Sequence, residues 1–254
     1  MGKPITGLSP RREQVLQERQ MVRMAKRIEA RVGRSIRKAM LDMAQSSGNP
    51  SESALAIKRH QDEMRQILRQ EYEQVFKWFG GRILQSTKKQ IEYPAEFLSA
   101  MEDWIALNGS IAVTQIAFTT QSQAMAIINE MVAQTAIEGL GEREAAKLLL
   151  STMREKGGVL SRARAQVISR TEAHNAAGSA THIAAKESGI PMMKRWVSTG
   201  GNRTREDHVE ADGQTVPIDK PFIVGGEELM YAGDPNGSAA NVCNCRCVVV
   251  YETV

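Results

Sequence analysis

All three cysteines of the chain lie within five residues, in the segment NVCNCRC at 241–247. In a fully extended strand, side chains two positions apart are about 6–7 Å from each other, which is too far for an easy disulfide or a shared metal ion. Cys243, Cys245 and Cys247 could therefore act together only if the chain bends, and the asparagines around them favour a bend. Three cysteines also form no disulfide scaffold for a chain of this length, which makes a redox role less attractive than metal binding.

A structural zinc site needs four ligands, usually Cys and His from two separated segments. The second segment here is RTREDHVEADG at 203–213, a polar loop that contains His208 and the turn-forming pair Asp212-Gly213. We predict a zinc core of His208, Cys245 and Cys247, completed by Cys243, Asp212 or a water. A single C-x-C is a weak signal, and the alternative is that both cysteines are small buried residues at the start of a core strand, with His208 as a hydrogen-bonded loop residue.

Two enzyme interpretations remain open as alternatives. Arg170, Ser198-Thr199 and Glu227-Glu228 follow the order of the Arg, Ser-Thr-Ser and Glu-x-Glu series of ADP-ribosyltransferases. The glutamates are adjacent rather than alternating, and the intervals are short for that fold, so this interpretation is weak.

The second enzyme interpretation is a metal-dependent nuclease that uses His208, Asp207 and Asp212. It requires a catalytic metal with an open coordination position, whereas two thiolates favour a closed structural site. The sequence contains no legible Ser-His-Asp arrangement, Gly-rich phosphate loop or paired-carboxylate motif, and we therefore predict no enzymatic activity.

The elements that must position these residues lie in the C-terminal part of the chain, which we place at 156–254. A helix at 161–190 is predicted to end at Gly189 and Pro191. Short extended segments then follow, separated by glycine-rich loops. They are MKRWVST, PFIV, LMY and CVVVYETV. This pattern indicates a small, mostly antiparallel α+β domain whose segments a zinc ion could cross-link.

The rest of the chain is predicted to be helical. Residues 1–90 form a basic arm or hairpin of two long helices, one starting at Ser9-Pro10 and one from Ser51 to Phe79, where Gly80-Gly81 interrupts it. Residues 91–155 form a helical region of three or four helices. The weakly charged stretch 110–140 has the composition of a buried helix, and 141–158 is a short amphipathic helix closed by glycines.

The charge is divided unevenly between these regions. Residues 1–90 contain 19 Lys and Arg against 9 Asp and Glu, although the whole chain has a net charge of only +4. A basic helical part can contact an anionic partner, although a solvated helix face is an equally good explanation. No apolar run approaches the roughly 20 residues that a membrane helix needs, and the N-terminus lacks the apolar region of a secretory signal. We expect a protein made in a reducing cytoplasm, without membrane contact.

At the C-terminal segments the chain resembles a known family, the phage Mu F-like minor head proteins, also called the phage head morphogenesis family. The resemblance covers roughly residues 140–254 and rests on several short motifs in the same order and spacing. Its signature residues are Arg170, Glu172, Trp196, Arg203, Asp212, Gly213, Asp234 and Arg246, together with His208 and the Cys245-Arg246-Cys247 end. Many relatives have Cys-x-x-Cys where this chain has Arg205 to His208, so one likely ligand is missing here and Cys243 is its candidate replacement.

The resemblance implies a structural protein of the virion head that acts at the portal vertex and is needed for head assembly. Its implied partners are the portal protein, the major capsid or scaffold protein, and packaged double-stranded DNA contacted without base reading. Its implied location is the virion head, with the host cytoplasm during assembly. The implied cofactor is a structural Zn²⁺.

Overall fold

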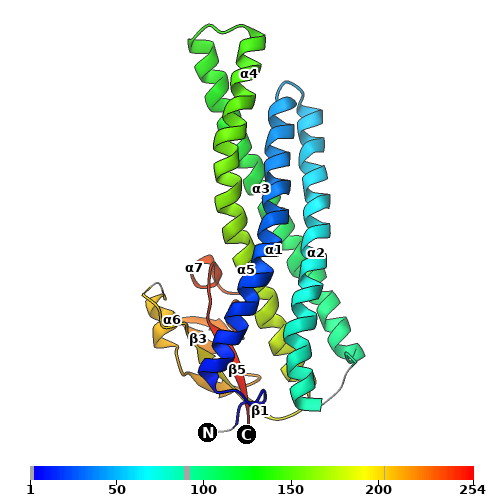
Figure 1. Cartoon of the computed structure of the whole chain (residues 1–254), viewed down its shortest axis with the longest axis vertical. Helices are drawn as coiled ribbons and strands as arrows, with labels where there is room; N and C mark the ends of the chain where they lie inside the picture. The colour runs from blue at the N-terminus through cyan, green and yellow to red at the C-terminus, as the bar shows by residue number, and fades with distance from the viewer. Residues whose placement is uncertain (1–2, 89–91, 203) are drawn as a thin grey trace. The chain divides into compact units, whose positions relative to one another are not determined.

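A computed structural model describes residues 3–88, 92–202 and 204–254 (Figure 1). Long helices precede short strands along the chain, which confirms the predicted α+β class. The described residues form two compact units. One comprises the segment up to Lys26 together with Gln70–Ala106 and Ser169–Val254, and the other comprises Arg27–Arg69 and Leu107–Ile168.

Helices α1 (Pro10–Gln45) and α2 (Pro50–Lys88) form an antiparallel hairpin (Figure 1). Each begins with a proline, whose missing N–H costs nothing at the first helical position. Asn49 caps α2, because its Oδ1 accepts hydrogen bonds from the N–H groups of Ser51 at 3.1 Å and Glu52 at 3.3 Å. The predicted apolar face of α1 is confirmed, since all of its residues are buried. They are Met21, Ala25, Ile28, Val32, Ile36, Ala39 and Met43.

The prediction that Gly80-Gly81 interrupts the second helix is wrong, because α2 continues through both glycines. The reason is the close approach of aromatic rings. A Cβ at Gly80 would collide with the ring of Phe97, and one at Gly81 would lie 3.1 Å from the hydroxyl of Tyr93. These glycines make room for Phe97 of α3 and for Tyr93 just before that helix, and they do not act as helix breakers.

The region after α2 contains fewer helices than predicted. Helix α3 (Ala95–Ile137) is a single helix of 43 residues, and only α4 (Glu142–Thr152) follows it before residue 153. The glycines predicted to close this short helix do not end it. Instead, the π-helical turn η1 (Met153–Gly157) leads into α5 (Gly158–Glu187). A Cβ at Gly157 would lie 3.1 Å from Met153 Sδ, so the small residue again serves packing.

The middle of α3 is not buried on all sides, contrary to the prediction from its composition. One face is buried, but an apolar stripe on the other is exposed, with Phe118 70% exposed. The stripe comprises Leu107, Ile111, Phe118, Met125 and Val132, the last four at intervals of seven residues. Exposed apolar surface of this extent is typical of a face that another protein covers. No helix among the described residues is long and apolar enough to span a membrane.

The C-terminal sheet has the order β2-β1-β5, and both pairings are antiparallel. Its central strand is β1 (Met192–Val197), flanked by β2 (Thr215–Pro217) and β5 (Val248–Thr253). A separate hairpin consists of β3 (Phe222–Val224) and β4 (Glu227–Leu229), joined by Gly225 and Gly226 with φ of 57° and 79°. The short helices α6 (Glu206–Glu210) and α7 (Ala239–Val242) lie in segments predicted as loops.

Candidate metal centre

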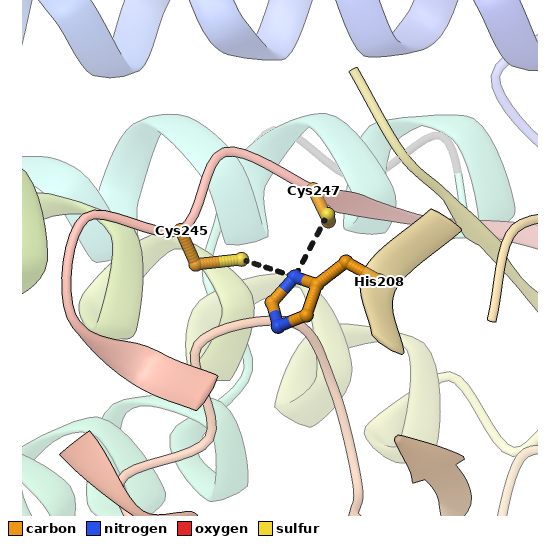
Figure 2. A group of neighbouring side chains, drawn as sticks. All are labelled: His208, Cys245 and Cys247. Carbon is orange, nitrogen blue, oxygen red and sulfur yellow. Dashed lines mark hydrogen bonds between the residues drawn. The ribbon is translucent and has the colours of Figure 1, made fainter. Parts of the chain in front are cut away.

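Three of the predicted ligands lie together in the structure (Figure 2). His208 lies on α6, Cys245 follows α7, and Cys247 immediately precedes β5. The bend that this grouping requires occurs at Asn244, whose φ of 56° lies in the left-handed region that asparagine tolerates well. All three side chains are buried, with exposed fractions of 2%, 5% and 2% for His208, Cys245 and Cys247.

The donor atoms are spaced as a tetrahedral zinc site requires. His208 Nδ1 lies 3.3 Å from Cys247 Sγ and 3.6 Å from Cys245 Sγ, and the three donor atoms lie within 4.8 Å of one another. Zn–S and Zn–N bonds of about 2.3 Å and 2.0 Å at a tetrahedral angle place N and S about 3.5 Å apart. One imidazole and two thiols in this arrangement could hold a metal ion, with a fourth ligand still to be supplied.

The two thiols differ strongly in acidity. A hydrogen bond from Cys247 lowers the pKa of Cys245 well below its ordinary value. The same hydrogen bond, together with burial, raises the pKa of Cys247 far above its ordinary value. The lowered pKa favours the thiolate form of Cys245, and the thiolate is the form of cysteine that binds metals.

The ring of His208 and the backbone of Cys247 are held by buried aromatic and imidazole groups. Trp196, which is fully buried, packs edge-on against His208 with ring centroids 5.6 Å apart and an interplanar angle of 84°. His174 Nε2 lies 2.7 Å from the carbonyl oxygen of Cys247, which fixes the entrance to β5 against α5. His174 was not predicted for this role, because helical spacing alone does not reveal a backbone partner 73 residues away.

Asp212 and Cys243, the other predicted ligands, lie outside the three-residue group. Asp212 Oδ1 accepts a hydrogen bond of 2.7 Å from the N–H of Ser198. Its neighbour Gly213 has φ of 81° and donates its N–H to Trp196 at 2.9 Å, so this pair forms the turn that leads back to β1. The backbone carbonyl of Cys243 accepts a hydrogen bond from the guanidinium of Arg205.

Two other signature residues make buried polar contacts away from the centre. The hydroxyl of Tyr72 donates a 2.6 Å hydrogen bond to Glu172, and burial raises the pKa of Glu172 to about 7. Asp234 is 1% exposed and accepts hydrogen bonds from the N–H groups of Met230 at 2.8 Å and Asn236 at 3.0 Å. Arg203 lies outside the described residues.

The centre forms one wall of a polar cavity of about 690 Å³. Two signature residues, Arg170 and Arg246, line this cavity together with Arg205, and α1 contributes Glu18 to the lining. The loop residues Thr199, Gly201, Asn202 and Thr204 complete much of the lining. Sequence reasoning missed this cavity, because its arginines come from three separate segments.

Comparison with known proteins finds a family model that matches the part of the chain containing this centre. A family model described as Phage Mu protein F like protein matches residues 126–250. The matched segment includes α5, strands β1 to β4, the first half of β5 and the three grouped residues His208, Cys245 and Cys247. No solved structure shows a significant match to the chain.

Three curated relatives are similar over shorter ranges. The chain is 32% identical over 124 residues to the uncharacterized protein YqbB of Bacillus subtilis, covering 47% of this chain and 39% of the relative. It is 28% identical over 153 residues to the minor head protein GP7 of Bacillus phage SPP1, covering 58% and 47%. It is 36% identical over 88 residues to the NAD(+)-arginine ADP-ribosyltransferase EFV of Enterococcus faecalis, covering 33% and 18%. The chain therefore spans less than half the length of each of these relatives.

Proposed function

We propose that this chain is a structural minor head protein of a tailed bacteriophage, because residues 126–250 match the family model described as Phage Mu protein F like protein. The observation that carries the proposal is the family match over the segment that contains the candidate metal centre. The similarity to the minor head protein GP7 supports it, since that match covers 58% of this chain. The proposed role is head morphogenesis at the portal vertex.

The proposed partners are the portal protein, the major capsid or scaffold protein, and packaged double-stranded DNA bound without sequence preference. The exposed apolar stripe of α3 and the exposed basic side chains of α1 support assembly with other virion components. The proposed location is the virion head, with the host cytoplasm during assembly. We retain residues 1–90, 91–155 and 156–254 as the proposed functional regions.

The metal proposed for the centre is a structural zinc ion, held by His208, Cys245 and Cys247. It would connect α6 to the start of β5, two parts of the chain that are 37 to 39 residues apart. A small sheet buries little surface by itself, so a metal link between these segments contributes directly to folding. Cys243, Asp212 or a water remains the proposed fourth ligand.

We propose a non-enzymatic role, and the cavity lining supports this. Arg170 and Thr199 line the cavity, but Glu227 and Glu228 of the ADP-ribosyltransferase-like series are not among the lining residues. The carboxylate of Glu227 instead accepts a 2.8 Å hydrogen bond from the N–H of Ser238. The similarity to the enzyme EFV covers only 18% of that protein and does not transfer its activity.

Co-purification tests the proposed role. The full chain is co-expressed with a tailed-phage portal protein, and separately with a major capsid protein, and each mixture is fractionated by size. Co-elution with portal protein is the expected result. If the chain elutes alone from both mixtures and also fails to retard duplex DNA, the proposed role is wrong.

Incubation with labelled NAD and arginine-rich proteins tests the first enzyme alternative. Transfer of label that R170K abolishes would overturn the non-enzymatic proposal. The nuclease alternative is tested by incubation of plasmid with Mg²⁺ or Mn²⁺, where cleavage lost in H208A would be the contrary result.

A further inference from the structure

The cavity beside the candidate metal centre has a strongly basic lining. Arg170 on α5, Arg205 before α6 and Arg246 between the two metal-centre cysteines all line it. Glu18 is the one carboxylate among the lining residues of the described chain. Three guanidinium groups against one carboxylate leave an excess of two positive charges in a partly enclosed space, where charge is screened less than on an open surface.

A zinc ion in the adjacent centre would not remove this excess. Two thiolates balance the two charges of Zn²⁺, and the imidazole ligand is neutral. The metal centre with His208, Cys245 and Cys247 is thus close to neutral, and the arginines remain uncompensated. The cavity is therefore suited to an anion whether or not the metal is bound.

Two of the three guanidinium groups are free to bind a ligand. Within the described part of the chain, neither Arg170 nor Arg246 makes a hydrogen bond or an ion pair. The third, Arg205, is held in place by its hydrogen bond to the carbonyl of Cys243. Guanidinium forks match the geometry of phosphate oxygens and bind them through paired hydrogen bonds.

We propose that this cavity binds a phosphate group through Arg170, Arg205 and Arg246. Its volume of about 690 Å³ exceeds the space that a single phosphate fills, and it is within the range of typical ligand pockets. The phosphate can therefore belong to a larger molecule, such as a nucleic acid backbone, or be free inorganic phosphate. The proposal does not depend on the virion role proposed above.

The test is equilibrium dialysis of the full chain, prepared with zinc, against radiolabelled inorganic phosphate at low ionic strength. One saturable site per chain is expected. The double variant R170Q/R246Q should lose about tenfold or more in affinity, which corresponds to about 1.4 kcal/mol. The matched control R143Q/R162Q removes the same charge from exposed positions outside the cavity and should bind normally. R170K/R246K should bind more tightly than R170Q/R246Q, because it keeps the charge.

Absence of saturable binding, or equal binding by the two glutamine double variants, would overturn the proposal. Melting curves accompany each variant, and little change is expected because both side chains are exposed and have no hydrogen-bond or ion-pair partner among the described residues. A short DNA duplex is then added as competitor. Displacement of labelled phosphate by the duplex assigns the site to the nucleic acid backbone, and binding of phosphate without displacement assigns it to the free anion.

Discussion

The metal centre is defined by a few atoms, and the cysteines provide an internal control for it. The full chain expressed with ample zinc should contain about one zinc per chain by elemental analysis. C245S and C247S should each lose the metal, because each removes a sulfur from the group. C243S should retain more metal than either, because all three grouped ligands remain in it. Equal metal content in C243S and C245S would contradict the three-residue centre.

Removal of the metal with a chelator tests whether the metal stabilises the fold. Removal of a structural metal withdraws binding free energy from the folded state, so the melting temperature of the wild-type chain should fall in chelator. C245S/C247S should already melt at the lower temperature and show no further change in chelator. A wild-type melting temperature that does not change in chelator would show that the metal has no structural role.

The Tyr72–Glu172 contact predicts a pH dependence of stability. Burial raises the pKa of Glu172 from 4.5 to about 7, although the hydrogen bond from Tyr72 lowers it. Because the pKa of Glu172 is higher in the folded than in the unfolded chain, the protonated carboxyl group stabilises the folded state. This contribution is complete below pH 4.5 and is lost as the pH rises through about 7. The wild type should therefore lose roughly 2 kcal/mol relative to E172Q between pH 5 and pH 8. Urea denaturation at both pH values measures the difference.

The exposed carboxylate of Glu144 provides the control for this experiment. E144Q should follow the wild-type curve at both pH values. If E172Q also runs parallel to the wild type, Glu172 does not titrate in this window. Y72F should steepen the loss above neutral pH, because it removes the hydrogen bond that favours the ionised carboxylate.

At the scale of elements, the two kinds of helical glycine should respond in opposite ways to substitution. G80A places a Cβ against the ring of Phe97 and should destabilise the chain by about 1–3 kcal/mol. G158A meets nothing closer than 3.8 Å and should stabilise the chain by up to about 1 kcal/mol, as alanine normally does within a helix. Denaturation midpoints in urea report both changes. Stabilisation by G80A would show that Phe97 does not fill the space above Gly80.

These glycines also show which parts of the fold the sequence could predict. The start of α1 at Pro10 and the end of α5 before Gly189 follow from local signals, and the structure confirms both. The role of Gly80 could not be predicted, because it depends on a ring that arrives from another helix. In the same way, the exposed stripe of α3 has the composition of a buried helix, and only its surroundings distinguish the two.

In the candidate site, too, some features could be predicted from the local sequence and others depend on the tertiary fold. His208, Cys245 and Cys247 were predictable as a group, because few residue types bind metals and these lie near bend-forming residues. The positions of Asp212 and Cys243 depend on backbone hydrogen bonds that no spacing rule gives. The three arginines of the cavity come from α5, the residue before α6 and the cysteine segment, so their proximity is a property of the tertiary fold.

At the scale of the whole molecule, the uneven charge predicts a salt-dependent contact with DNA. Arg34, Arg37 and Lys38 are exposed on α1, in the basic first part of the chain. Each phosphate contact adds about −0.9 to the slope of log affinity against log salt concentration for duplex DNA. If these side chains contact DNA phosphates, changing all three to Gln should make the slope of log affinity against log salt concentration shallower by about 2–3.

The matched control for this measurement is a variant with Arg143, Lys147 and Arg154 changed to Gln. These three side chains are also exposed, lie on α4 and η1, and carry the same total charge. Because non-specific binding depends on local phosphate contacts, only the α1 variant should change the slope, and duplexes of different sequence should give the same result. Equal slopes for the two variants would mean that net charge alone attracts DNA. The basic first part would then be a solvated helix face, which is the other interpretation of its charge.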